Sequence, residues 1–182
     1  SEITTENKVI GLAKNAFGIV ESETSSIQEN FSPVISEDNL HTKVTSVEKS
    51  TDKITIADAD IVVSGGRGLK GPENWGMIEE LAETLGAATA CSKPVSDLGW
   101  RPHSEHVGQT GKPVSSNLYI AVGISGAIQH LAGVNSSKVK VVINSDSEAP
   151  FFKAADYGIV GDAFEYVPQL IQKLKEFKSN NA

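Results

Sequence analysis

Three polar side chains gather around glycines in one short stretch, YIAVGISGAIQHLAG, which runs from Tyr119 to Gly133. The stretch predicts a buried strand, a glycine turn and the start of a helix. Ser125, Gln129 and His130 fall in or just after the turn, where a purely structural segment is more often apolar. A hydroxyl, an amide and an imidazole at such a turn suit either nucleophilic catalysis or the binding of a polar ligand.

A serine hydrolase is the first interpretation of this turn. The segment GISGA approximates a nucleophile elbow with Ser125 as the nucleophile, although Ala127 stands where that pattern has glycine. An α/β-hydrolase needs an acid and then a histidine later in the chain. His130 lies in the same predicted helix as the turn, and no histidine follows it. The residues cannot assemble a triad in the expected order.

A nicotinamide dinucleotide domain is the second interpretation. The segment GRGLKG at 66–71 matches G-x-G-x-x-G between a predicted strand and a predicted helix. Glycines in that context allow backbone N–H groups to approach a pyrophosphate. The ribose-binding acid expected after the second strand is missing, because that strand ends in Cys91, Ser92 and Lys93 and the next acid is Asp97. An NAD(P)-binding domain of an oxidoreductase therefore stays open as the alternative.

A flavin dinucleotide is the third interpretation. It requires polar contacts spread along a pyrophosphate, a ribityl chain and an adenosine, and a positive or donor group where negative charge collects on the reduced ring. The cations available near the predicted strand ends are His130, Lys93 and Arg67. The neutral hydrogen-bonding side chains there are Thr110, Gln109, Ser125 and Gln129.

From about Asp58 the sequence alternates between strand-like and helix-like segments. The predicted strands cover 60–66, 87–92, 118–122, 138–144 and 156–160. One predicted helix begins near Pro72 and stops at Gly86, and a second opens after 123–127. The last helix has its apolar side at Val167, Leu170, Ile171, Leu174 and Phe177, with Pro168 in or near its first turn. This alternation predicts an α/β fold, a Rossmann-like nucleotide-binding parallel sheet flanked by helices on both faces.

Small or polar residues stand at the carboxyl end of every predicted strand. These ends are Ser64–Gly68, Ser92–Lys93, Gly123–Ser125, Asn144–Asp146 and Gly161–Asp162. Ligands of open parallel sheets bind outside the carboxyl ends of the strands. A ligand site is therefore predicted along this edge.

The first part of the chain differs in character. Residues 1–57 hold polar stretches between short β-prone runs, Lys8–Ala13 and Thr42–Val47. We expect a short β-rich peripheral segment over 1–57, the remnant of an upstream domain, followed by a ligand-binding domain over 58–182.

Composition excludes several classes of function. The formal net charge of −7 disfavours nucleic acid and anionic membrane surfaces as partners. One cysteine cannot form an intrachain disulfide, which favours a reducing compartment. No apolar run approaches the ~20 residues of a membrane-spanning helix, and the opening SEITTENK has no signal-peptide pattern. His103 and His106 lie in a loop without a third ligand, so no metal site is predicted there.

Longer segments of the chain resemble one family. These segments are VVSGGRGLKGPENW, GAATACSKPVSDLGW, HVGQTGK, LYIAVGISGAIQHLAG and VVINSDSEAPFFKAADYGIVGD. They follow the order found in the C-terminal FAD-binding domain of the electron transfer flavoprotein alpha subunit, from about Ile61 to Leu174. Residues 1–57 match it only loosely, and the family's alpha subunit is longer, so the chain is similar to a piece that holds the flavin domain.

The resemblance implies a set of FAD-binding residues. They are Arg67, Ser92, Lys93, Val107, Gly108, Gln109, Thr110, Ser125, Gly126, Ala127, Ile128, Gln129, His130, Asn144, Asp162 and Ala163. Thr110 would lie near the ring N5 and His130 by the C2 carbonyl, with Lys93 and His130 supplying positive potential. Asn144 and Asp162 would match the adenosine end. The family usually has arginine where this chain has Lys93, which keeps the charge but not the planar fork.

The resemblance also implies a function. Bound FAD would accept electrons from dehydrogenases such as acyl-CoA dehydrogenases and pass them to a quinone oxidoreductase. The protein would pair with an electron transfer flavoprotein beta subunit, in a bacterial cytoplasm or a mitochondrial matrix. It would be an electron carrier rather than an enzyme with its own substrate.

Overall fold

The computed structural model describes residues 2–12, 21, 25, 27–40, 42–46 and 55–181. Gly18–Lys53 forms a unit separate from the rest of the chain. In the described part of that unit the regular element is a short 3-10 turn, Glu37–Asn39. The packed α/β region begins by Ile56, which is buried together with Ala59.

The two β-prone runs of the N-terminal region do not form strands where the structure describes them, over 8–12 and 42–46. That prediction is wrong there, while Ala13 and Val47 lie outside the described residues. Val9 and Val44 are exposed, at 100% and 74%. An extended segment needs a neighbouring strand and an apolar face to cover, and these exposed side chains have neither among the residues that the structure describes. The proposed domain boundary at 57/58 stays a prediction.

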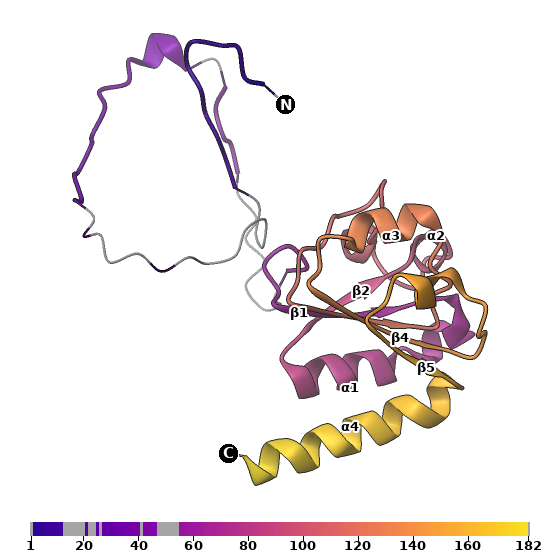
Figure 1. Cartoon of the computed structure of the whole chain (residues 1–182). Coiled ribbons are helices and arrows are strands. Elements are labelled where there is room, and N and C mark those ends of the chain that lie inside the picture. The colour runs from indigo at the N-terminus through magenta and orange to yellow at the C-terminus, as the bar shows by residue number, and fades with distance from the viewer. Residues whose placement is uncertain are drawn as a thin grey trace. The chain divides into compact units, whose positions relative to one another are not determined.

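A five-stranded, fully parallel sheet forms the centre of the α/β region (Figure 1). Its strands are β1 Ile61–Gly65, β2 Ala88–Cys91, β3 Leu118–Val122, β4 Val139–Asn144 and β5 Tyr157–Val160, in the spatial order β2-β1-β3-β4-β5. The helices are α1 Gly76–Leu85, α2 Lys93–Asp97, α3 Ile128–Val134 and α4 Ala163–Asn180. Short 3-10 turns occupy Arg67–Leu69, Pro72–Asn74, His103–Glu105 and Pro150–Lys153. The predicted strands and fold class are confirmed.

Two hydrophobic clusters cover the two faces of the sheet. On one face Val63 belongs to a cluster with Ile78 of α1 and Val167 of α4. On the other, Val62 belongs to a cluster with Val134 of α3. Adjacent strand residues serve opposite faces because side chains alternate along a strand. Figure 1 shows α1 and α4 together on one side of the sheet and α3 on the other, so the prediction of helices on both faces is confirmed.

The helix ends follow local chemistry, with two departures in α4. Gly86 ends α1 in the left-handed region at φ 67°, as predicted. Asp162 caps α4, and Pro168 lies one turn further into that helix than expected. Phe177 is 66% exposed, so its predicted place on the apolar side is wrong. The last turns of α4 contact α1 instead through polar groups, such as the ion pair of Lys175 with Glu80.

The strand order creates a switch point between β1 and β3. The chain leaves β1 for β2 on one side and later returns to β3 on the other, so connections diverge at the carboxyl ends of β1 and β3. In open parallel sheets this divergence leaves a crevice for ligands. The same spatial order, 2-1-3-4-5, is found in flavodoxin-like folds.

Glycines let the backbone after β1 touch the backbone after β3. The Gly66 amide donates to the Val122 carbonyl at 2.8 Å, and the Gly68 amide donates to the Gly123 carbonyl at 3.0 Å. A Cβ atom on Gly66 would lie 2.1 Å from the Gly123 oxygen. These two amides of the GRGLKG segment therefore serve packing between two connections, and they are not left for a phosphate.

None of the helices in the described ranges of the chain is both long and apolar enough to cross a membrane.

Replacing Gly66 by alanine should destabilise the fold by at least about 2 kcal/mol, because the added methyl group meets backbone that cannot rotate away. Gly76→Ala is the control, since a Cβ there meets nothing within 4 Å and the residue opens α1. The control should stabilise the protein by about 0.5–1 kcal/mol. Urea unfolding measures both. Equal stability of the two variants would contradict the packing role of Gly66.

Candidate functional site

A pocket of about 690 Å³ opens at the carboxyl edge of the sheet, beside the switch point. The connections after β1, β2, β3 and β4 and the loop before β3 supply its lining. Most of the residues predicted from the sequence line it: Arg67, Ser92, Lys93, Val107, Gly108, Gln109, Thr110, Ser125, Ala127, Gln129, His130 and Asn144. The volume lies within the range of ordinary ligand pockets.

Four predicted residues do not line this pocket. Gly126 is buried at φ 84° against the backbone of Phe151, and Ile128 is 80% exposed at the start of α3. Asp162 accepts a hydrogen bond from the Phe164 amide at 2.9 Å as the cap of α4. Ala163 is buried in the core. A role of these four residues in cofactor binding stays a prediction.

The structure adds lining residues that sequence reasoning missed. They are Gly68, Pro94, His106, Gly123, Ile124 and Asp146. Gly68, Gly123, Ile124 and Asp146 lay within the strand ends identified above, so the signal for them was present. His106 was assigned to a loop without a role, and its position directly before Val107 was the signal that could have found it.

A loop from His106 to Lys112 closes one end of the pocket. Its start joins the sheet edge, because the Val107 amide donates to the Cys91 carbonyl at 3.0 Å. Its middle is attached to α3, where the Gln109 amide donates to the Gln129 carbonyl at 2.7 Å. A Cβ on Gly133 would lie 2.6 Å from the Gly108 Cα, so small residues allow this contact. The contacts place Gln109 and Thr110 at the pocket rim.

Arg101 holds the segment that precedes this loop. Its guanidinium donates two hydrogen bonds to Glu105, at 2.8 and 2.7 Å, and a third to Glu79 of α1 at 3.1 Å. It also lies over the Trp75 ring, 5.3 Å from the centroid. The hydrogen bonds to Glu105 raise the pKa of Arg101. Because His106 follows Glu105 directly, this cluster fixes where the pocket loop begins.

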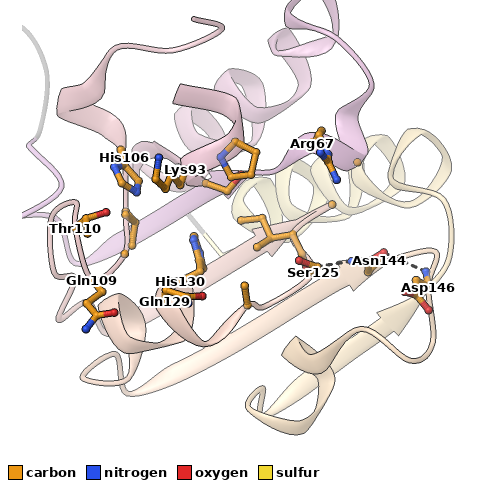
Figure 2. Close-up of a pocket in the computed structure, with 18 residues that line it drawn as sticks. Arg67, Lys93, His106, Gln109, Thr110, Ser125, Gln129, His130, Asn144 and Asp146 are labelled. Atoms are coloured by element: carbon orange, nitrogen blue, oxygen red, sulfur yellow. Dashed lines mark hydrogen bonds between the residues drawn. The ribbon is translucent and has the colours of Figure 1, made fainter. Parts of the chain in front are cut away.

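Charged groups are unevenly distributed around the pocket. Figure 2 shows Lys93, from the connection after β2, beside His106, and Arg67, from the connection after β1, at a separate place toward Asn144. Lys93 forms an ion pair with Asp97, whereas Arg67 forms none with any residue that the structure describes. Positive potential is therefore concentrated near Arg67.

Asn144 and Asp146 lie on the same side of the pocket as Arg67 in Figure 2. The Asn144 amide donates to the Ile124 carbonyl at 3.0 Å, and its Oδ1 accepts from the Asp146 amide at 3.0 Å. In Figure 2, His106, Gln109 and Thr110 lie at one end of an extended strip, and Asn144 and Asp146 lie at the other. The strip suits a long ligand that is polar along its length.

His130 and His106 are both buried in the pocket wall. His130 is 7% exposed, and its Nε2 lies 2.9 Å from the Tyr119 hydroxyl. Burial, and after it the neighbouring His106, lower the pKa of His130 to about 4. Burial, followed by His103 and Lys93, also lowers the pKa of His106. His130 is therefore neutral near pH 7, and its predicted role as a source of positive potential is wrong for the protein by itself.

The site does not assemble a serine hydrolase. The imidazole of His130 is hydrogen-bonded to Tyr119 rather than to Ser125. Across the described ranges of the chain, no group of three or more His, Cys, Asp or Glu residues could hold a metal ion.

Residues 55–135 match the family model described as the electron transfer flavoprotein FAD-binding domain. The alpha subunit from Thermoanaerobacterium thermosaccharolyticum is 48% identical over 149 residues, covering 81% of this chain and 45% of that protein. The mitochondrial alpha subunit of Dictyostelium discoideum is 53% identical over 144 residues, covering 79% of this chain and 40% of that protein. The chain belongs to the electron transfer flavoprotein alpha-subunit family. The resemblance predicted from the motifs is confirmed.

The chain spans less than half the length of these alpha subunits. The alpha subunit of Bacillus subtilis gives the same picture, with 52% identity over 130 residues that cover 71% of this chain and 40% of that protein. The relatives include bacterial and mitochondrial forms. The region that matches the FAD-binding model includes the pocket residues from Arg67 to His130, but not Asn144 or Asp146.

The buried His130 should make stability depend on pH. The pKa of His130 is about 4 in the folded chain against an ordinary value of 6.5, so the unfolded chain binds more protons between these values. The stabilising contribution of the neutral ring is complete above 6.5 and is lost as the pH falls toward 4.

His130→Gln should remove this contribution. Between about pH 7.5 and about pH 5, the free energy of unfolding of the parent chain should fall by about 2 kcal/mol more than that of the variant. Urea unfolding at both pH values measures the difference. Parallel pH dependence in the two proteins would show that folding does not lower the pKa of His130.

Proposed function

We propose that the pocket binds FAD non-covalently and that the protein serves as the flavin-carrying part of an electron carrier. The arrangement of the lining supports this proposal most directly. Polar groups from four strand-end connections and the loop before β3 lie along one extended strip at the switch point, within a region that matches an FAD-binding family model. Bound FAD supplies the electron-accepting chemistry, because none of the side chains needs to react.

The residues of the strip fit the parts of such a ligand. Arg67 is exposed at the pocket and forms no ion pair within the described parts of the chain, so it is available to a phosphate group. Lys93 adds a point charge, without the fork of an arginine. The Nδ1 atom of His130 is buried without a hydrogen-bond partner, and a ligand acceptor would satisfy it.

We assign the flavin ring to the end formed by His106, Gln109, Thr110 and His130, and the adenosine to the end near Asn144. An adenosine that extends beyond the pocket along the carboxyl edge would reach the connection after β5, where Asp162 and Ala163 lie. Thr110 would then donate to the ring, and Ser125 and Gln129 would contact the chain between its ends.

The partners follow from the same proposal. The relatives are named alpha subunits, and we propose that a beta subunit completes the site on the pocket's open side. Electrons would come from dehydrogenases such as acyl-CoA dehydrogenases and leave to a quinone oxidoreductase. We propose a location in the bacterial cytoplasm or the mitochondrial matrix.

Loading the purified full chain with FAD tests the proposal. A stoichiometric yellow complex with quenched flavin fluorescence is expected. Arg67→Ala should weaken FAD binding by roughly tenfold or more, because it removes a charge-assisted hydrogen bond. Lys138→Ala is the matched control, since it removes the same charge from an exposed residue just before β4, at the opposite edge of the sheet. It should leave the affinity unchanged.

The NAD(P) alternative gives the opposite result. Saturable NADH binding with no flavin bound would refute our proposal. The Gly66 amide already donates to the end of β3 and the Gly68 amide to the residue that follows it, which argues against a pyrophosphate at that loop.

A further inference from the structure

A buried hydrogen bond joins the sheet to the pocket wall. The hydroxyl of Tyr119, in β3, lies 2.9 Å from Nε2 of His130, in α3. Tyr119 is 0% exposed and His130 is 7% exposed. Because water does not reach this pair, the direction of the hydrogen bond determines which ring nitrogen carries the proton.

The surroundings of Tyr119 show which atom donates. Burial raises the pKa of its hydroxyl, so the hydroxyl keeps its proton. Ser64 Oγ, the other polar side-chain atom near it, acts on the hydroxyl as a donor that lowers this pKa, although it makes no hydrogen bond of ordinary geometry. A buried hydroxyl with a single partner loses its donor bond if it only accepts. The hydroxyl therefore donates to Nε2, and the proton of the neutral ring must reside on Nδ1.

The remaining ring nitrogen is unsatisfied. Nδ1 of His130 is buried and makes no hydrogen bond of ordinary geometry, although the Val107 backbone lies near enough to raise the pKa of the ring and the residue lines the pocket. The charged or titratable groups around the ring are His106 from the loop, Lys93 beyond it and Tyr119 from the sheet. None of them is an acid that would hold the ring in its charged form.

We propose that Tyr119 is a positioning residue that fixes His130 as the Nδ1–H tautomer, so that the pocket offers its ligand an uncharged hydrogen-bond donor. The ligand group that matches it is a carbonyl oxygen or another acceptor on a heteroaromatic ring. This role rests on the proposed function only for the identity of the ligand. The tautomer belongs to the chain itself and can be measured without any ligand.

Nitrogen NMR of the full chain labelled with ¹⁵N-histidine provides the decisive measurement. His130 resonances are identified by their loss in His130→Gln. We expect the chemical shifts of a protonated Nδ1 and an unprotonated, hydrogen-bonded Nε2 near neutral pH. Tyr119→Phe should convert this pattern into a mixture of tautomers, while Ser64→Ala, which removes the neighbouring hydroxyl without a hydrogen bond, should leave it unchanged. A protonated Nε2 in the parent chain would overturn the proposal.

Ligand binding provides the second readout. Tyr119→Phe should weaken FAD binding by roughly three- to tenfold, the usual range for one hydrogen bond, and Ser64→Ala should not. If the parent chain binds no FAD, the proposed function fails while the NMR result still decides the tautomer. If both variants bind FAD as the parent does, the positioning role is overturned.

A third experiment tests the proposal even if the Tyr119→Phe variant does not fold. Incorporation of 3-fluorotyrosine makes the phenol more acidic and strengthens it as a donor. The Nε2 resonance of His130 should then shift further toward that of a strongly hydrogen-bonded acceptor. An unshifted resonance would show that the hydroxyl does not donate to the ring.

Discussion

The close contact between the backbone after β1 and the backbone after β3 determines the site. Two amide-to-carbonyl hydrogen bonds, from Gly66 to Val122 at the end of β3 and from Gly68 to Gly123 just after it, tie the first connection to the second where the strand order diverges. Without these hydrogen bonds, the connections after β1 and β3 would be two independent loops on either side of a gap. Because the loops are tied at their base, their outer residues Arg67 and Ser125 face one shared space (Figure 2).

Burial then decides the electrostatics of that space. Burial lowers the pKa of two histidines in the wall, His130 and His106, whereas the cationic side chains of Arg67 and Lys93 are exposed. The pocket thus combines fixed cations at its mouth with neutral hydrogen-bonding rings inside. Such a division matches a ligand with anionic phosphates and a polar, uncharged ring system.

The sequence predicted the sheet and most of the pocket for one physical reason. β-branched runs ending in glycine or polar residues mark parallel strands, and the carboxyl ends of parallel strands must meet at one edge. Positions that depend on tertiary pairing were not predictable in this way. The Arg101–Glu105 cluster and the burial of His106 arise from contacts between distant segments, and the pKa of His130 depends on how completely its surroundings in the fold bury it. Phe177 fits the apolar stripe of a helix, but in this last part of α4 the contacts with α1 are made by Lys175 and Lys178.

The lone thiol lies under the start of the pocket loop. Cys91 is fully buried at the end of β2, its carbonyl accepts from Val107, and burial raises the pKa of its thiol to about 12. An alkylating reagent needs both access and a thiolate, so the closed protein presents it with neither. The rate at which the intact chain becomes alkylated therefore reports how often this corner opens. Cys91 is therefore a natural probe for local opening of the protein at the edge that carries the pocket.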